Sequence, residues 1–218
     1  MGERGIKPKG KVKIKWSPEF AYAIGLIATD GCLSIDGYHI VLVSKDTQQL
    51  LTFKHCLGID TKLGKHSSGR NKRKYFHVQF GDVLFYHFLL GIGLTPAKSK
   101  TLGELNVPQV YFFDFLRGCF DGDGSFYSYW DPRWRSSFMY YLELASASKN
   151  FIDWIRRSLQ TKLRVKGHVT KDSKGSTYQL KYAKKESLKI IKKMYYSDTV
   201  ACLARKKEKI HKALELDK

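Results

Sequence analysis

Two short stretches with matching residues, AIGLIATDG at positions 23–31 and LRGCFDGDG at positions 116–124, decide how the rest of this sequence is interpreted. Both are apolar and end in an Asp-Gly pair. Alignment on that pair places Asp30 opposite Asp123, so that matching positions lie 93 residues apart. A match of this kind within one chain is typical of an internal repeat, in which each copy forms the same unit of structure.

The sequence after each stretch repeats one pattern: two β-prone runs, a helical segment, two further β-prone runs and a closing helix. The predicted strands lie at residues 32–36, 38–44, 61–68, 74–81, 125–130, 137–148, 161–169 and 176–183, and the helices at 46–58, 82–93, 149–160 and 185–196. Pairing of neighbouring strands implies an antiparallel sheet with helices on one face. We therefore predict an α+β fold of two pseudo-symmetric αββαββα halves. Their expected bounds are 1–102, including a basic tail at 1–16, a linker at 103–110 that contains Pro108, and 111–218.

The composition limits the possible functions. The chain has 218 residues with 39 Lys and Arg against 20 Asp and Glu, a formal net charge of +19. Such an excess usually persists because a polyanion neutralises it, so we expect nucleic acid binding, with DNA and RNA both open. The four cysteines are widely spaced and indicate neither a zinc site nor a disulfide framework. With no secretory signal and no apolar run that could cross a bilayer, a soluble intracellular protein without a membrane partner is expected.

The repeated stretches also predict a site. Small residues recur one turn apart, Gly25 with Thr29 and Gly118 with Gly122, which lets two helix backbones approach closely. Asp30 and Asp123 would then lie side by side, where their repulsion favours a bound divalent metal. The alternative is that Asp-Gly simply ends each helix and begins a turn. Two such ends at matched positions of a basic chain favour the metal site.

Residues 23–31 and 116–124 resemble the two LAGLIDADG motifs of single-chain homing endonucleases, and the flanking pattern extends the resemblance from about Pro18 to Leu214. In the first motif Ala28 replaces the family's earlier acid, and Thr29 stands where a smaller residue is usual. The resemblance implies a monomer whose two halves form a saddle on double-stranded DNA. It also implies metal-dependent double-strand cleavage of a long target with short 3′ overhangs.

By the same resemblance, Asp30 and Asp123 bind a divalent metal together with the backbone carbonyls of Thr29 and Gly122. We expect Mg²⁺, with Mn²⁺ or Ca²⁺ able to replace it for binding. The family also places a lysine near each scissile phosphate, which here implies catalytic roles for Lys98 and Lys206. Lys45 is the candidate for a polar residue that positions the attacking water in the first half.

Alternation along the predicted strands places polar and basic residues on one sheet face, where they could read base edges, while basic loops would contact phosphates. The predicted DNA-binding residues are Ser34, Lys62, Lys65, Arg70, Lys72, Arg73, Lys74, Tyr75, His77, Gln79, Ser125, Tyr127, Tyr129, Arg133, Arg135, Arg164, Lys166, His168, Lys171, Gln179 and Lys181.

Two other functions stay open at this stage. The same fold serves RNA-binding intron maturases, so intron RNA is a second possible partner. It could also serve a regulator that binds DNA without cutting it. Retention of both Asp30 and Asp123 favours the endonuclease. The target sequence and the host do not follow from the residues.

Overall fold

The computed structural model describes residues 10–66, 75–134, 136–172 and 175–217. The first half contains α1 (Pro18–Thr29), β1 (Gly31–Leu33), β2 (His39–Ser44), α2 (Thr47–Leu57), β3 (Gly64–His66), β4 (Tyr75–Gly81) and α3 (Val83–Gly91). A connecting segment carries two short 3-10 helices, η1 (Lys98–Lys100) and η2 (Gln109–Tyr111). The second half contains α4 (Phe112–Asp123), β5 (Gly124–Trp130), β6 (Phe138–Ser146), α5 (Lys149–Leu163), β7 (His168–Lys171), β8 (Tyr178–Ala183), α6 (Lys184–Met194) and α7 (Ala204–Leu216).

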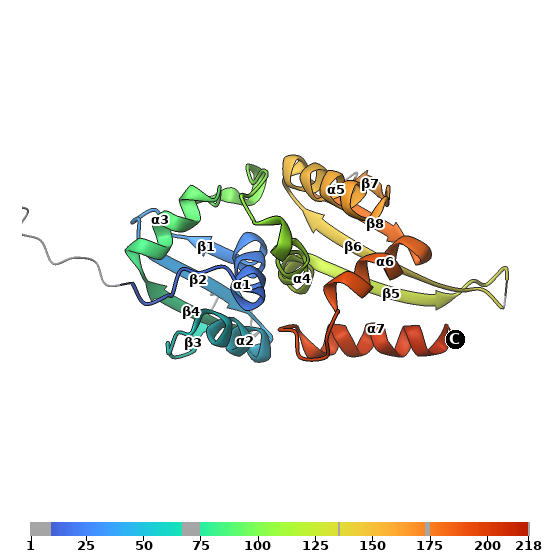
Figure 1. Cartoon of the computed structure of the whole chain (residues 1–218), viewed down its shortest axis with the longest axis horizontal. Helices are drawn as coiled ribbons and strands as arrows, with labels where there is room; N and C mark the ends of the chain where they lie inside the picture. Colours follow the sequence, from blue (N-terminus) through green and yellow to red (C-terminus); the bar gives the residue numbers. More distant parts are fainter. Residues whose placement is uncertain (1–9, 67–74, 135, 173–174, 218) are drawn as a thin grey trace, which may run out of the picture.

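Each half forms one antiparallel four-stranded sheet, with the strand orders β1-β2-β4-β3 and β5-β6-β8-β7. The two sheets lie on either side of the central helices α1 and α4 (Figure 1). The prediction of two αββαββα units with antiparallel sheets is therefore confirmed. Pairing differs from simple serial order, because β2 pairs with β4 and β6 with β8, which places the second hairpin of each half beside the inner strand of the first.

Local sequence explains where the central helix of the first half begins. The hydroxyl of Ser17 accepts a hydrogen bond from the amide of Phe20 at 3.1 Å, and Pro18 occupies the first helical position. The Ser17 hydroxyl satisfies a first-turn amide that has no partner within the helix. Proline suits the first helical position because it has no backbone N–H that would need such a partner. The helix is buried from Phe20 to Ala28, so it belongs to the core and not to the surface.

The second half departs from prediction in two places. The expected strand at 161–169 is wrong, because α5 continues to Leu163 and only His168 and Val169 of that range are in a strand, β7. Arg164 ends α5 with φ 55°, so Arg164 and Lys166 lie in a connection and not on the alternating face of a sheet. The helix α7 was not predicted. Its sequence is strongly basic, and only Ile210 and Ala213 are buried, too few for a clear apolar period.

The buried side chain of Arg117 holds the segment between α6 and α7 against α4. Arg117 is fully buried and donates to the backbone oxygens of Ala201 at 2.7 Å and Met194 at 2.5 Å, and to the carboxylate of Asp114 at 2.8 Å. Every arm of the guanidinium therefore has a partner, which a buried charge requires. The result is that the segment leading into α7 is fastened to the central helix.

None of the helices in the described ranges combines the length and apolar character needed to cross a membrane.

Candidate nucleic-acid cleavage site

The helices α1 and α4 approach until their backbones touch. A methyl group placed on Gly25 would lie 2.2 Å from the backbone oxygen of Phe115, and one placed on Gly118 would lie 2.1 Å from that of Tyr22. Real carbon atoms do not come this close to backbone atoms, so both positions require glycine. The predicted close packing of the two small-residue faces is confirmed.

One turn further on, Thr29 faces Gly122. A methyl group on Gly122 would lie 2.0 Å from the Thr29 hydroxyl oxygen and 3.2 Å from Oδ2 of Asp30. The larger Thr29 is accommodated because its partner has no side chain and because its hydroxyl donates to its own helix, at the backbone oxygen of Gly25. The carboxylate of Asp30 thus lies directly beside the second motif.

The electrostatics of the two motif aspartates reflect this proximity. Burial raises the pKa of Asp30 to about 6, and the charge of Asp123 adds to that increase. Asp123 is exposed on its outer side, yet desolvation by the protein behind it raises its pKa as well. Because α1 and α4 both end here, the partial negative charges of two helix C-termini add to the carboxylates. The site therefore favours a cation.

Two lysines supply part of that positive charge at matched positions. The ammonium of Lys98, on η1, donates to the backbone oxygen of Gly31, which follows Asp30. The ammonium of Lys206, in the first turn of α7, donates to the equivalent Gly124 at 2.6 Å. Burial lowers the pKa of Lys98, and burial lowers that of Lys206 to about 8. The two lysines thus stand beside the two aspartates with the symmetry of the repeat.

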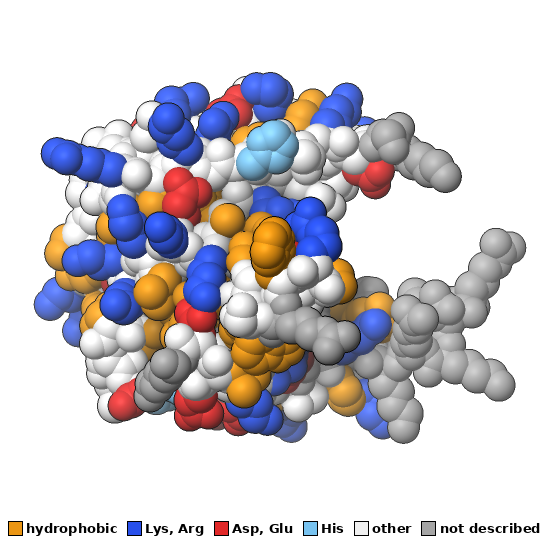
Figure 2. All heavy atoms as spheres, turned by 90° about the vertical axis from the view of Figure 1, so that its right-hand side faces the viewer, with side chains coloured by type: hydrophobic (Ala, Val, Ile, Leu, Met, Phe, Trp, Pro, Cys, Tyr) orange, Lys and Arg blue, Asp and Glu red, His pale blue; other side chains and the backbone are white. Residues whose placement is uncertain are grey.

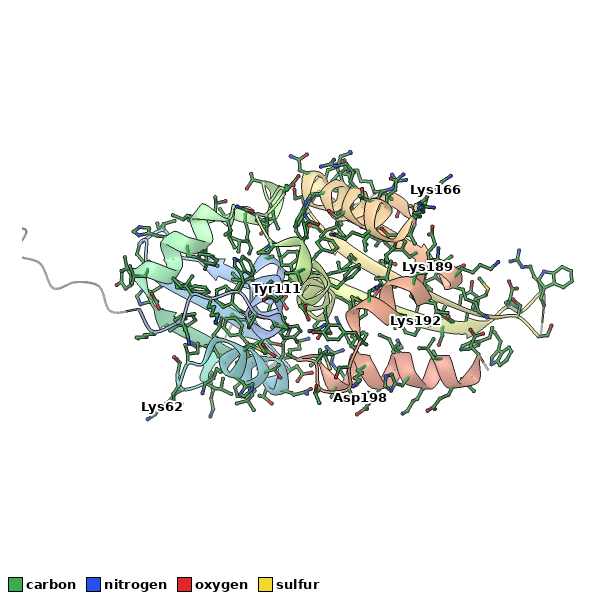
Figure 3. All side chains as sticks on the ribbon, in the orientation of Figure 1. Lys62, Tyr111, Lys166, Lys189, Lys192 and Asp198 are labelled. Carbon is green, nitrogen blue, oxygen red and sulfur yellow. The ribbon has the colours of Figure 1, made fainter. Side chains whose placement is uncertain are left out.

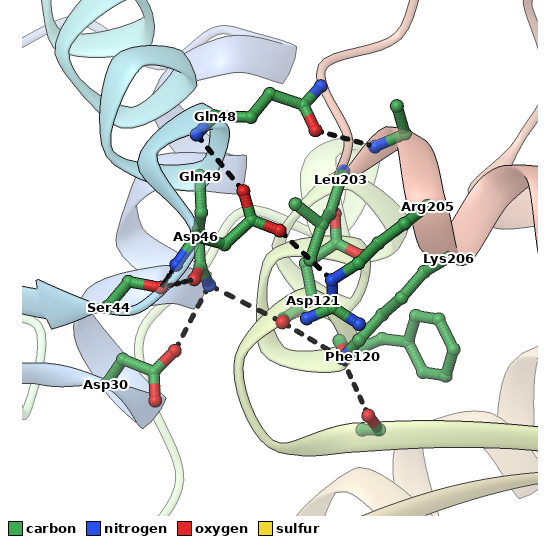
Figure 4. Close-up of polar contacts among 12 residues, drawn as sticks. Asp30, Ser44, Asp46, Gln48, Gln49, Phe120, Asp121, Leu203, Arg205 and Lys206 are labelled. Carbon is green, nitrogen blue, oxygen red and sulfur yellow. Dashed lines mark hydrogen bonds and ion pairs between the residues drawn. The ribbon is translucent and has the colours of Figure 1, made fainter. Parts of the chain in front are cut away.

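Figure 4 shows a further polar side chain at the site, Gln49 of α2, which sequence reasoning missed. Its amide donates to Oδ2 of Asp30 at 3.1 Å and reaches the backbone oxygen of Asp121 at 3.4 Å, while its oxygen accepts from Ser44 at 2.6 Å. Gln49 is buried, so these contacts orient it firmly. Lys45, the sequence-based candidate for a polar group here, is exposed and lies 5.1 Å from the centre of the Tyr75 ring.

The repeat symmetry is broken at Asp121, whose counterpart is Ala28. Asp121 is buried, and one of its oxygens accepts from the Tyr22 hydroxyl at 2.9 Å and from the amide of Leu203 at 2.7 Å. It therefore fastens the residue just before α7 to the end of α4. The ion pair of Arg205 with Asp46, at 3.0 Å, also joins the two halves (Figure 4).

The donor set suits a hard divalent cation. Within the ranges that the structure describes, no three His, Cys, Asp or Glu side chains gather into a metal cluster. What the site offers is two carboxylates, whose mutual repulsion a cation would relieve, and the carbonyl oxygens of Thr29 and Gly122 next to them. Mg²⁺ is commonly held in this way, by one or two carboxylates, with water and phosphate oxygens completing its shell.

The exposed face of the second sheet carries several of the residues predicted to contact DNA. Strand pairing sets Ser125 beside Glu143, Glu143 beside Lys181, and Lys181 beside His168, so all four share one face. Tyr127 and Tyr129 of β5 both stack on Tyr141 of β6, with ring centres 5.2 and 6.2 Å apart. Gln179, two residues from Lys181 on β8, points the same way.

On β4 of the first sheet, Tyr75, His77 and Gln79 alternate with Phe76, Val78 and Phe80, of which Val78 and Phe80 are buried. Ser34, just after β1, is half-buried, and Lys62 is exposed before β3. Lys65 pairs with Phe76, and so lies on the opposite face from Tyr75 and His77.

The remaining predicted contacts lie away from the sheet faces or outside the described residues. Arg133 is exposed but paired with Asp131 at 3.0 Å. Lys171, at the end of β7, lies over the Tyr178 ring, on the opposite face from His168. Arg164 and Lys166 are exposed in the connection after α5. The predicted contacts that fall outside the described residues are Arg70, Lys72, Arg73, Lys74 and Arg135.

Comparison with known proteins agrees with this architecture. A family model described as a LAGLIDADG-like domain matches residues 113–195, within the second half. A search of curated protein sequences found no match.

Solved structures of the same fold cover nearly the whole chain. The homing endonuclease I-WcaI, bound to its DNA recognition sequence, superposes with a TM-score of 0.63 at 13% identity, covering 95% of each chain. I-DmoI in complex with DNA and Mn gives a TM-score of 0.54 at 16% identity, over 83% of this chain and 97% of that one. Full-length DUF199/WhiA from Thermatoga maritima gives 0.58 at 17% identity, over 94% of this chain.

This protein spans only 63% of the full-length WhiA chain that it matches. The structural neighbours are too distant in sequence to transfer an activity, but they share the fold over most of this chain. The second half therefore contains a LAGLIDADG-like domain, and the chain as a whole has the fold of these two-domain structures.

Proposed function

We propose that this protein is a DNA endonuclease that cuts both strands of a long, specific duplex in a reaction that requires a divalent metal. The observation that carries the proposal is the matched arrangement at the ends of α1 and α4. Asp30 and Asp123 lie at the helix ends, and Lys98 and Lys206 each bind the carbonyl of the glycine that follows. A fold alone would not require all four charged groups at equivalent positions.

In this proposal the carboxylates of Asp30 and Asp123, with the carbonyls of Thr29 and Gly122, hold the metal, with Mg²⁺ as the expected ion. A bound divalent ion supplies a polarised phosphate and an activated water. Lys98 and Lys206 place fixed positive charge where negative charge develops on the phosphate, which is most effective in a site that excludes water. A phosphate in contact with these lysines would raise their pKa, which would offset the lowering that burial causes.

Gln49 orients Asp30 in the same scheme. Its amide donates to one carboxylate oxygen, which leaves the other free for a metal or a water. Outer-shell partners of this kind typically change metal affinity or activity by about 10- to 100-fold when removed. The exposed sheet faces, with residues such as Gln79, Ser125 and Lys181, would contact the bases on either side of the cut.

Cleavage of a randomised duplex library by the purified protein, with Mg²⁺ and with EDTA, tests the proposal and supplies the target. We expect metal-dependent products that share one long sequence and carry short 3′ overhangs. Asp30→Asn and Asp123→Asn should then lose more than about 100-fold in double-strand cleavage while duplex binding persists, because a ligand matters more than its outer-shell partner.

Asp60→Asn is the matched control, since Asp60 is fully exposed beyond α2 and the substitution removes the same charge. Full cleavage by either motif variant would contradict the assignment of the site.

A non-cleaving DNA-binding protein is the second candidate, because WhiA, which is not described as an endonuclease, has a TM-score similar to that of the endonucleases. It predicts tight duplex binding with no strand scission on any sequence in the library. Preference for folded intron RNA over duplex would instead favour a maturase.

A further inference from the structure

The helical faces of the two halves differ sharply in charge. Helix α5 carries four Lys or Arg and one Asp, and α6 carries five Lys and one Glu. The corresponding helices of the first half, α2 and α3, carry one Lys between them. Because both halves share one fold, the first half shows that this fold does not need a basic helical face. The charge of α5 and α6 therefore requires a separate explanation.

The lysines of α6 form a row on its outer surface. Ser187, Ile190, Ile191 and Met194 face the core, whereas Lys185, Lys189, Lys192 and Lys193 are exposed. Lysines three or four residues apart on one helix repel each other and reduce its stability. None of these four forms an ion pair with any residue in the described ranges, so the repulsion is not relieved within that part of the protein.

The segment after α5 extends this row into a patch. The carboxylate of Glu186 accepts the backbone amides of Lys166 at 2.7 Å and Gly167 at 3.2 Å, which holds that segment against α6. The single acid of α6 is therefore occupied by backbone groups. Arg156 donates from Nε to the backbone oxygen of Lys166 at 2.8 Å, and Arg157 is exposed beside it on α5.

Figure 3 shows Lys166, Lys189 and Lys192 together on the second half. At the end of the molecule seen in Figure 2, Lys and Arg side chains predominate over acidic ones. We call the exposed set Lys166, Lys185, Lys189, Lys192 and Lys193 the α5–α6 patch.

The patch and the proposed cleavage surface lie on opposite sides of the second sheet. Helices α5 and α6 cover the sheet face that contains buried Leu142, Leu144 and Leu180. Ser125, Tyr127 and Lys181 lie on the other face, because side chains alternate along a strand. A duplex seated on the sheet face would leave the α5–α6 patch free.

We propose that the α5–α6 patch binds the phosphate backbone of a second DNA duplex, so that one molecule can hold two DNA segments. Lysines four residues apart along a helix are about 6 Å apart, on the order of the distance between neighbouring phosphates of one strand. Lysine acts as a point charge, and a duplex carries a higher density of phosphate charge than a single strand. Binding to it would therefore be independent of sequence and would favour a duplex over a single strand.

The inference goes beyond the proposed function, since capture of a second duplex needs neither metal nor cleavage. The test uses an immobilised duplex, the full-length protein and a fluorescent duplex in EDTA, over a series of salt concentrations. We expect wild-type protein to retain the fluorescent duplex. A triple variant with Lys185→Gln, Lys189→Gln and Lys192→Gln should retain at least about 10-fold less fluorescent duplex. The slope of log affinity against log salt should become shallower by up to about 2.7.

The matched control replaces Lys11, Lys13 and Lys15 by Gln, which removes three charges from another exposed segment. It should capture the second duplex like wild type, and circular dichroism checks that both variants fold. Direct binding of the first duplex should persist in each.

Four results would overturn the proposal. One is equal capture by the two triple variants, and another is no capture by wild type at low salt. The third is capture by a protein dimer, detected by light scattering at the same concentration, since two sheet faces could then hold the two duplexes. A competing RNA helix that displaces the fluorescent duplex while excess unlabelled DNA does not would overturn the assignment to DNA.

Discussion

Gly118→Ala tests the packing that creates the candidate site. The added methyl group would lie 2.1 Å from the backbone oxygen of Tyr22 and 3.0 Å from the Cα of Gly25. A carbon and an oxygen without a bond between them need a little over 3 Å, so α1 and α4 must separate by about 1 Å. Because the obstructing atoms are backbone atoms, no side chain can rotate away to relieve the contact.

The magnitude follows from two opposing effects. Overpacking a tight interior typically costs about 1–3 kcal/mol, and backbone contact places this case near or above the upper end. Alanine is more favourable than glycine within a helix by about 1 kcal/mol, which offsets part of that cost. We expect the free energy of unfolding to fall by about 2 kcal/mol or more. The same separation moves Asp30 away from Asp123, so metal-dependent cleavage should fall as well.

Urea unfolding followed by circular dichroism, in EDTA, measures the effect without any contribution from bound metal. Gly91→Ala is the matched control. Gly91 ends helix α3, and a methyl group there meets nothing within 4 Å, so this change should leave stability unchanged or raise it slightly. If Gly118→Ala unfolds at the same urea concentration as Gly91→Ala, the result contradicts the close backbone contact between α1 and α4.

Three further predictions concern polar groups. Arg117→Met should reduce the free energy of unfolding by about 3–5 kcal/mol in urea titrations, because it removes the cation that pairs with the buried carboxylate of Asp114. Arg157→Met, on the surface, should change the free energy of unfolding by less than about 0.5 kcal/mol. Gln49→Ala should reduce Mg²⁺-dependent cleavage by about 10- to 100-fold, with a matching shift in the Mg²⁺ concentration needed, because the oriented contact with Asp30 is lost; unchanged Mg²⁺ dependence would remove Gln49 from the site. Lys206 has a lowered pKa of about 8, so its charged form is disfavoured in the folded state, and wild-type stability should rise between pH 8 and pH 10 relative to Lys206→Met; parallel pH profiles would show that the lysine is not desolvated.

Much of the architecture was predictable because it depends on local signals that occur twice. The Asp-Gly ends at Asp30 and Asp123 and the small residues before them predicted a helix pair, and alternation in Tyr75–Gly81 predicted a strand. The range 161–169 was misassigned because its alternation mimics a strand. In the structure, Trp154, Ile155 and Leu159 anchor α5 on the sheet and the helix continues to Leu163.

Other parts of the site depend on contacts between distant residues. Gln49 lies 19 residues from Asp30 and 72 from Asp121, and neither separation follows a local period. The segment leading into α7 is held by Arg117 and Asp121, so the position of Lys206 depends on residues more than 80 positions earlier in the sequence. Such contacts have no signature in spacing, because the folded core alone brings their partners together.

The amino-acid sequence by itself determined that the protein has two repeats, a basic surface and one aspartate at the end of each central helix. Short-range periodicity and charge are sufficient for these conclusions, since both act over a few residues or over the whole chain. Only the tertiary structure decided that glycine backbones touch at the helix pair, that Lys98 and Lys206 bind equivalent carbonyls, and that the basic residues occupy two separate faces. Those features arise from packing between segments far apart in sequence, where shape and burial choose the partners.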